Sequence, residues 1–114
     1  MNPTKSRRPW IALFAAFLAL GPGLARAAPP AVIVMIDNFA FDAQTVTVEP
    51  GSTVTWINDD DAPHTVVADD GKSFRSKVLD TGDEFSFTFM TTGTFGYFCS
   101  VHPHMTGKVV VKAP

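Results

Sequence analysis

From residue 31 onward, hydrophobic and polar residues alternate in short runs that are separated by turn-forming residues. The segment TVTVEPGSTVTWIN, residues 45–58, contains two alternating runs that are split by Glu49-Pro50-Gly51. Similar short runs are AVIVMI (31–36), HTVVA (64–68), TFGYFC (94–99) and KVVVK (108–112). A period of two is typical of a half-buried β-strand, and no window in this part of the chain keeps a helical period.

A further predicted strand, FSFTF at residues 85–89, has one aromatic and one polar face. Phe85, Phe87 and Phe89 alternate with small hydroxyl residues, so one face is aromatic and the other is polar. The stretch from Asp69 to Gly82 is irregular, and we expect a mixed loop there with at most a short helical or strand turn. About seven to eight short strands joined by Gly/Pro turns predict an all-β protein, an antiparallel sandwich or barrel.

The first 27 residues differ from the rest and have the features of a secretory signal. A basic start precedes an apolar run over residues 10–20, and Ala25-Arg26-Ala27 fits the A-x-A cleavage pattern. The apolar run is too short to span a bilayer comfortably. We therefore predict a cleaved signal peptide over 1–27, one domain over 28–114 with no membrane span, and a periplasmic location. A partial twin-arginine match at residues 6–10 leaves the export route open.

Removal of the signal changes the charge of the protein. Of the 9 basic residues in the whole chain, four lie in the predicted signal, whereas all 11 acidic residues lie after it, so the domain carries a net charge of −6. Such an acidic domain is poorly suited to bind nucleic acid or anionic lipid. A basic protein is the better candidate partner.

The domain contains a single cysteine, Cys99, so no disulfide can form within the chain. Small exported domains often rely on disulfides, and an unpaired thiol is a chemical liability in an oxidising compartment. Metal ligation is one reason to retain it.

Cys99 belongs to a ten-residue stretch, GYFCSVHPHM, that is rich in metal-binding side chains. Cys99, His102 and Met105 are spaced C-x2-H-x2-M at the end of a predicted strand, where a tight loop can direct three side chains to one point. His64 is the candidate fourth ligand, provided that two strand ends meet at one pole of the sandwich. One thiolate, two imidazoles and one thioether match a His2Cys copper site with a weak axial Met, whereas structural zinc sites rarely use Met.

Each of these residues has a simpler interpretation when it is taken alone. A lone cysteine or methionine is usually a buried hydrophobic residue, and a lone histidine is usually a surface residue. Cys99 and His102 could also pair in a hydrolase, but that interpretation leaves Met105 and His64 without a role. The chain has no further His-rich motif and no second Cys for additional copper centres, so we predict that it is not an enzyme.

The chain resembles the cupredoxin family, and within it the amicyanin-like and plastocyanin-like members. The resemblance is carried by DNFAFDAQTVTVEPGSTVTWINDD, APHTVV, LDTGDEFSFTF and TGTFGYFCSVHPHMTGKVVV. It implies a Greek-key β-sandwich with one type 1 copper per chain, held by His64, Cys99 and His102 as equatorial ligands and by Met105 as the axial ligand. It also implies a one-electron carrier between a donor and an acceptor redox protein, for which we expect a basic cytochrome or a dehydrogenase, and we expect a monomer.

Three positions depart from the pattern of these relatives. Thr65 stands where many have an Asn that ties the two ligand loops together, and its hydroxyl could bond to Ser100 instead. Val101 stands where Pro is common, which removes one restraint and adds an N–H near the thiolate. His104 stands where amicyanin-like loops have an apolar residue, and we expect it to face solvent. The alternative is that it tunes docking or the reduction potential with pH.

Two questions stay open at the level of sequence. Asp59-Asp60-Asp61, just before His64, are either a solvated turn or part of a charged patch that attracts a basic partner. The alternative to electron transfer is a periplasmic protein that stores copper or delivers it to an oxidase, because the ligand set alone does not separate these functions.

Overall fold

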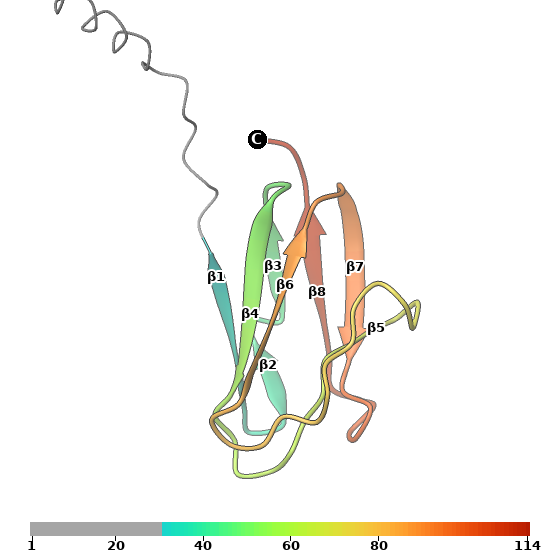
Figure 1. Ribbon diagram of the computed structural model, residues 1–114. Coiled ribbons are helices and arrows are strands. Elements are labelled where there is room, and N and C mark those ends of the chain that lie inside the picture. Colours follow the sequence, from blue (N-terminus) through green and yellow to red (C-terminus); the bar gives the residue numbers. More distant parts are fainter. Residues whose placement is uncertain (1–30) are drawn as a thin grey trace, which may run out of the picture.

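The computed structural model describes residues 31–114, which form eight strands in two four-stranded sheets (Figure 1). The strands are β1 (Val32–Asp37), β2 (Ala40–Asp42), β3 (Thr45–Val48), β4 (Ser52–Asn58), β5 (Val67–Ala68), β6 (Glu84–Phe89), β7 (Gly93–Phe98) and β8 (Thr106–Val111). The strand order is β2-β1-β4-β6 in one sheet and β3-β8-β7-β5 in the other. The predicted all-β sandwich of about seven to eight strands is confirmed.

The signal peptide predicted over residues 1–27 lies outside the described residues. In the described part, no helix is long and apolar enough to cross a membrane.

Both sheets mix parallel and antiparallel pairs, whereas the sequence predicted an antiparallel sandwich. β1 is parallel to β4 and β3 is parallel to β8, while β4–β6 and β7–β8 are antiparallel. The parallel pairs arise because the chain crosses to the second sheet between β2 and β3 and returns before β4. Alternation reveals which face of a strand is buried but not the direction of its neighbour, so the sequence could not show these pairs.

The core lies between the sheets and is built largely from aromatic rings. Trp56, Phe89 and Tyr97 are fully buried, and the Trp56 ring centroid lies 6.5 Å from that of Phe89 and 5.3 Å from that of Tyr97. On the opposite face of the same sheet, the hydroxyls of Thr55 and Ser86 are 2.7 Å apart. The two-faced pattern predicted for this strand region is therefore confirmed.

Two segments differ from the predicted strands. β2 shows no pattern in the sequence, because three residues are too few to establish a period. The predicted strand over residues 64–68 pairs with β7 only at its end, as β5, while His64 forms an isolated bridge with Leu79. The stretch from Asp69 to Gly82 contains no named strand, as predicted.

The connections at one end of the sandwich, the lower end in Figure 1, are the β1–β2 turn, the β4–β5 and β5–β6 connections and the β7–β8 loop. The chain leaves the β7–β8 loop through Gly107, which packs directly on Tyr97. A Cβ at this glycine would lie 2.5 Å from the Tyr97 hydroxyl oxygen, so only glycine permits the approach. The loop that carries three predicted ligands is thereby held close to the core.

Candidate metal centre

The β7–β8 loop folds back on itself and so brings three predicted ligands together. The Cys99 N–H donates to the Met105 carbonyl oxygen at 3.1 Å, and the Met105 N–H donates to the His102 carbonyl oxygen at 2.9 Å. The His102 N–H completes the turn by donating to the Cys99 carbonyl oxygen at 3.2 Å. Cys99 and Met105 are buried, while His102 is half-buried.

His64 comes from the β4–β5 connection and is held by its backbone. Its N–H donates to the Leu79 carbonyl oxygen at 3.1 Å, and the Leu79 N–H donates back at 2.7 Å. The buried Asn58 side chain braces both segments, because its amide donates to the Leu79 and Ala62 carbonyl oxygens at 2.8 and 2.9 Å. His64 itself is 0% exposed.

The two loops meet at the Cys99 sulfur. The sulfur lies 3.7 Å from Nδ1 of His64 and 3.8 Å from Nδ1 of His102, and the three donor atoms all lie within 4.8 Å of one another. Two donor atoms that each lie about 2 Å from one ion are separated by about 3–4 Å, so this spacing suits a shared metal ion. The sequence prediction that His64 lies beside the Cys99 loop is confirmed.

The surroundings of Cys99 favour the thiolate. Burial alone raises the pKa of the thiol, but the Thr65 N–H and the contacts with the His64 and His102 rings outweigh it and lower the pKa to about 6. The Thr65 N–H donates to the sulfur at 3.4 Å. The sequence pointed to an N–H at Val101, whereas the backbone N–H groups that lower the thiol pKa belong to Thr65 and, with a smaller effect, to His102. A deprotonated sulfur is the form that binds metal.

Thr65 also ties the two ligand loops together. Its hydroxyl oxygen lies 2.8 Å from the Ser100 hydroxyl and accepts the Ser100 N–H at 2.7 Å. The hydrogen bond expected between Thr65 and Ser100 is therefore confirmed.

Asp60 is buried, which corrects the expectation of a solvated or docking acid at this position. It is 8% exposed although Asp59 and Asp61 on either side are exposed. Its Oδ2 lies 2.9 Å from Nε2 of His64 and accepts the Phe39 N–H at 3.0 Å. The Phe39 N–H and the His64 ring hold the pKa of the Asp60 carboxyl below its usual value.

Phe39 is a second residue of the site that the sequence did not reveal. It lies in the β1–β2 turn, and its ring packs edge-on against both imidazoles. The ring centroids are 5.5 Å apart for His64 and 5.0 Å apart for His102, and the interplanar angles are 84° and 87°. The two aromatic residues of the DNFAF segment are visible in the sequence, but nothing in that segment predicts contact with His64 and His102, which lie 25 and 63 positions away. Phe39 is 48% exposed and so lies at the surface of the site.

The remaining rim is apolar and open. Val101 is 44% exposed, and Pro103 and His104 are also exposed. The expectation that His104 faces solvent is confirmed.

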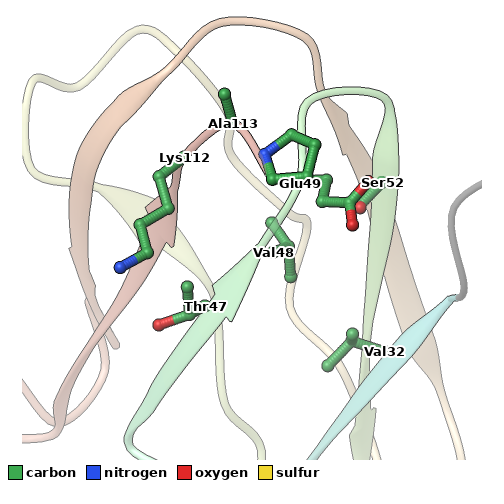
Figure 2. Close-up of a pocket in the computed structure, with 8 residues that line it drawn as sticks. Val32, Thr47, Val48, Glu49, Ser52, Lys112 and Ala113 are labelled. Atoms are coloured by element: carbon green, nitrogen blue, oxygen red, sulfur yellow. The ribbon is translucent and has the colours of Figure 1, made fainter.

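A separate apolar groove lies at the opposite pole and takes no part in this centre. Figure 2 shows its lining at the start of β1, the end of β3 and the chain segment after β8. The groove encloses about 290 Å³ and is lined by Val32, Thr47, Val48, Glu49, Ser52, Lys112, Ala113 and Pro114. Among the described residues that line it, the charged side chains are Glu49 and Lys112, and none carries a thiol or an imidazole.

Comparisons with known proteins agree with this arrangement. A family model described as copper binding proteins, plastocyanin/azurin family, matches residues 31–112. The amicyanin of Paracoccus versutus is 35% identical over 86 residues, which cover 72% of this chain and 65% of that protein, slightly under two thirds of its length. Amicyanin-alpha of Methylorubrum extorquens is 34% identical over 110 residues, 90% of this chain and 92% of that protein. A solved purple cupredoxin from Nitrosopumilus maritimus superposes with a TM-score of 0.68 at 32% identity, covering 71% of this chain and 99% of that one.

Proposed function

This chain belongs to the plastocyanin/azurin family of copper-binding proteins, and on that premise we propose that it is a type 1 copper protein that carries single electrons between redox proteins. The observation that carries the proposal is the meeting of a buried cysteine sulfur with Nδ1 of two histidines from separate loops. Copper, when bound, supplies the one-electron Cu(II)/Cu(I) couple.

The ligands in this proposal are His64, Cys99 and His102 as the three strong donors and Met105 as the weak fourth. Thiolate and thioether suit Cu(I), and imidazole suits Cu(II), so the set serves both oxidation states. Met105 is 3% exposed and closes the same tight loop as Cys99 through the backbone bond at 3.1 Å. These facts support Met105 as a ligand, because its side chain is kept from solvent beside the other donors.

Hydrogen bonds within the protein hold these donors in place. His64 is bridged to Leu79 by two backbone hydrogen bonds, and the Thr65 hydroxyl joins its loop to Ser100. A site whose donors are already assembled rearranges little when the oxidation state changes. Small rearrangement lowers the barrier to electron transfer, which favours a carrier.

His102 is the proposed point of electron entry and exit. It is the half-buried imidazole of the pair, and the rim around it is formed by exposed Val101, Pro103 and Phe39. An apolar rim permits close approach of a partner, and close approach shortens the distance that the electron crosses.

A basic redox protein, such as a cytochrome, or a dehydrogenase is the proposed partner. The exposed carboxylates Asp59 and Asp61 lie in the same connection as His64, just before it, and the domain carries eleven acids against five bases. Opposite charges steer association, and salt screens them. With a basic cytochrome, we expect the second-order rate constant of electron transfer to fall about tenfold or more between about 0.01 and 0.1 M ionic strength. Stopped-flow mixing measures this rate, and a rate that does not change with salt contradicts the proposed partner.

Export and the remaining functional predictions belong to the same proposal. The signal-like residues 1–27 support a periplasmic location, where a monomeric carrier would diffuse between its partners. Copper storage or delivery is not favoured, because two imidazoles and a thiolate held by the fold would release the ion slowly. That the protein is not an enzyme stays a prediction.

The decisive experiment is a visible spectrum of the copper-loaded, oxidised protein. We expect an intense thiolate-to-copper charge-transfer band that disappears on reduction and returns on oxidation. Fast self-exchange between the two forms supports the carrier. A weak band, or transfer of the copper to a chelator within seconds, contradicts it.

A further inference from the structure

Asp60 occupies an unusual position for a carboxylate. It is the middle residue of three consecutive aspartates, yet it is 8% exposed while its two neighbours are exposed. A buried carboxylate is unfavourable unless hydrogen bonds satisfy it. Both of its oxygens have partners, because Oδ1 accepts the Asp61 N–H at 2.8 Å and Oδ2 accepts from His64 and Phe39.

Other bonds hold the backbone of Asp60. Its N–H donates to the Asn58 side-chain oxygen at 2.9 Å, and its carbonyl oxygen accepts the Thr81 hydroxyl at 2.6 Å. The carboxylate is therefore held in one orientation, and it can fix the positions of His64 and Phe39, which donate to it.

The contact with His64 determines the form of that imidazole. An ionised carboxylate only accepts hydrogen bonds, so the proton lies on Nε2 of His64, 2.9 Å from Oδ2. Nδ1 then keeps its lone pair, and this atom lies 3.7 Å from the Cys99 sulfur. A carboxylate that accepts from the outer nitrogen of a metal-binding histidine fixes the ring and makes the inner nitrogen more basic.

The same carboxylate oxygen also holds the β1–β2 turn. Asn38 and Phe39 have φ values of 51° and 57°, in the left-handed region that is unfavourable for a bulky side chain such as that of Phe39. The Phe39 N–H donates to Asp60 Oδ2 at 3.0 Å, which stabilises this conformation. In it, the Phe39 ring lies edge-on to both His64 and His102.

We propose that Asp60 is a positioning residue of the copper site, which sets the Nε2–H tautomer and orientation of His64 and fastens Phe39 against both ligand imidazoles. The inference rests on the proposed function in that His64 binds copper. His102 has no equivalent, since within residues 31–114 no protein group hydrogen-bonds to its outer nitrogen. Asp60 thus hydrogen-bonds to the buried imidazole only, and it affects His102 only through Phe39.

The test compares Asp60→Asn and Asp60→Ala with Asp61→Asn and Asp61→Ala, which remove an exposed charge from the adjacent position. The first measurement uses the apoprotein and imidazole ¹⁵N NMR, so it does not depend on copper. We expect a slowly exchanging His64 Nε2–H in the wild type and in both Asp61 variants. Asp60→Asn retains this signal because its single amide oxygen can replace Oδ2 and accept from His64 and Phe39, although the bond from the Asp61 N–H is lost, whereas Asp60→Ala loses the signal.

The second measurement uses the copper protein. We expect Asp60→Ala to weaken Cu(I) binding about 10-fold or more in a competition titration with a chelator. Asp60→Asn should raise the reduction potential more than Asp61→Asn, because a neutral acceptor leaves the imidazole a weaker donor to Cu(II). Voltammetry measures this difference.

The proposal is overturned if Asp60→Ala keeps the slowly exchanging His64 Nε2–H, or if Asp60→Asn and Asp61→Asn shift the potential equally. Should Asp60→Ala not fold, the isosteric Asp60→Asn decides through its potential. Failure of the proposed function has a different signature, because wild-type protein would then lack the charge-transfer band while the NMR pattern of His64 stayed the same.

Discussion

The two imidazoles of the proposed copper site are the same chemical group in very different settings. His64 is 0% exposed, its backbone is bridged to Leu79, and its outer nitrogen bonds to Asp60. His102 is half-buried on a loop whose neighbouring residues, Val101 and Pro103, are exposed. Each presents Nδ1 to the same sulfur at nearly the same distance, 3.7 and 3.8 Å.

This difference separates two requirements of an electron carrier. The buried half keeps the donors in one arrangement in both oxidation states, which requires a ring that cannot turn. The exposed half presents an edge to a partner, which requires a ring near the surface. One histidine could not satisfy both, because the contacts that fix His64 also cover it.

Replacing each histidine by glycine in turn is the strongest test of the difference between His64 and His102. We expect added imidazole to restore the charge-transfer band of His102→Gly, because the vacated position opens to solvent, and to restore little of it in His64→Gly. His64→Gly should also lower the free energy of unfolding by about 2–4 kcal/mol, as expected for a buried cavity. His102→Gly should lower it by about 1 kcal/mol, the effect of an added glycine.

Imidazole titrations followed by visible absorbance, together with urea denaturation of the apoproteins, measure these effects. Wild-type protein with added imidazole is the control and should not change. Equal recovery of the band in both variants would contradict the distinction between a closed and an open half.

The sequence predicted the exposed half of the site, the loop that carries His102, better than the buried half around His64. Cys99, His102 and Met105 lie within seven residues, so their spacing alone brings them to one loop. His64 was predicted from the meeting of two strand ends, an argument about the fold that the structure confirms. The strand faces were predictable for the same local reason, since alternation is a property of consecutive residues.

Asp60 and Phe39 could not be predicted in this way. Three adjacent aspartates are chemically identical in the sequence, and only the bend of the chain after β4 turns the middle one inward. Phe39 meets both imidazoles because the β1–β2 turn reaches the pole where the ligand loops end. Such contacts depend on three-dimensional placement of distant segments, as do the parallel pairs β1–β4 and β3–β8.

The Cys99 thiol of the apoprotein contacts both the buried and the exposed half of the site, so its pKa reports on both. Its pKa is lowered to about 6 from an ordinary value of 9.0. An acid whose pKa falls on folding stabilises the folded state fully above its unfolded pKa. The apoprotein should therefore lose stability as the pH falls from 9 toward 6. Thiolate absorbance and urea denaturation across this range measure both effects. A thiol that titrates near 9 would show that the Thr65 N–H and the two rings do not favour the thiolate.

The smallest expected effect concerns the link between the halves. Thr65→Val keeps the shape of the side chain but removes its hydrogen bonds with the hydroxyl and the N–H of Ser100. At about 1 kcal/mol for each bond, the apoprotein should lose about 1–2 kcal/mol of unfolding free energy. Thr88→Val is the matched control, because its hydroxyl bonds to Thr53 on an exposed face of the sheet, where water replaces the bond and the loss should be about 0.5 kcal/mol or less. Equal losses in urea denaturation would mean that the loops are held by their backbones alone. A larger loss for Thr65→Val would show that the closed half also fixes the position of the open one.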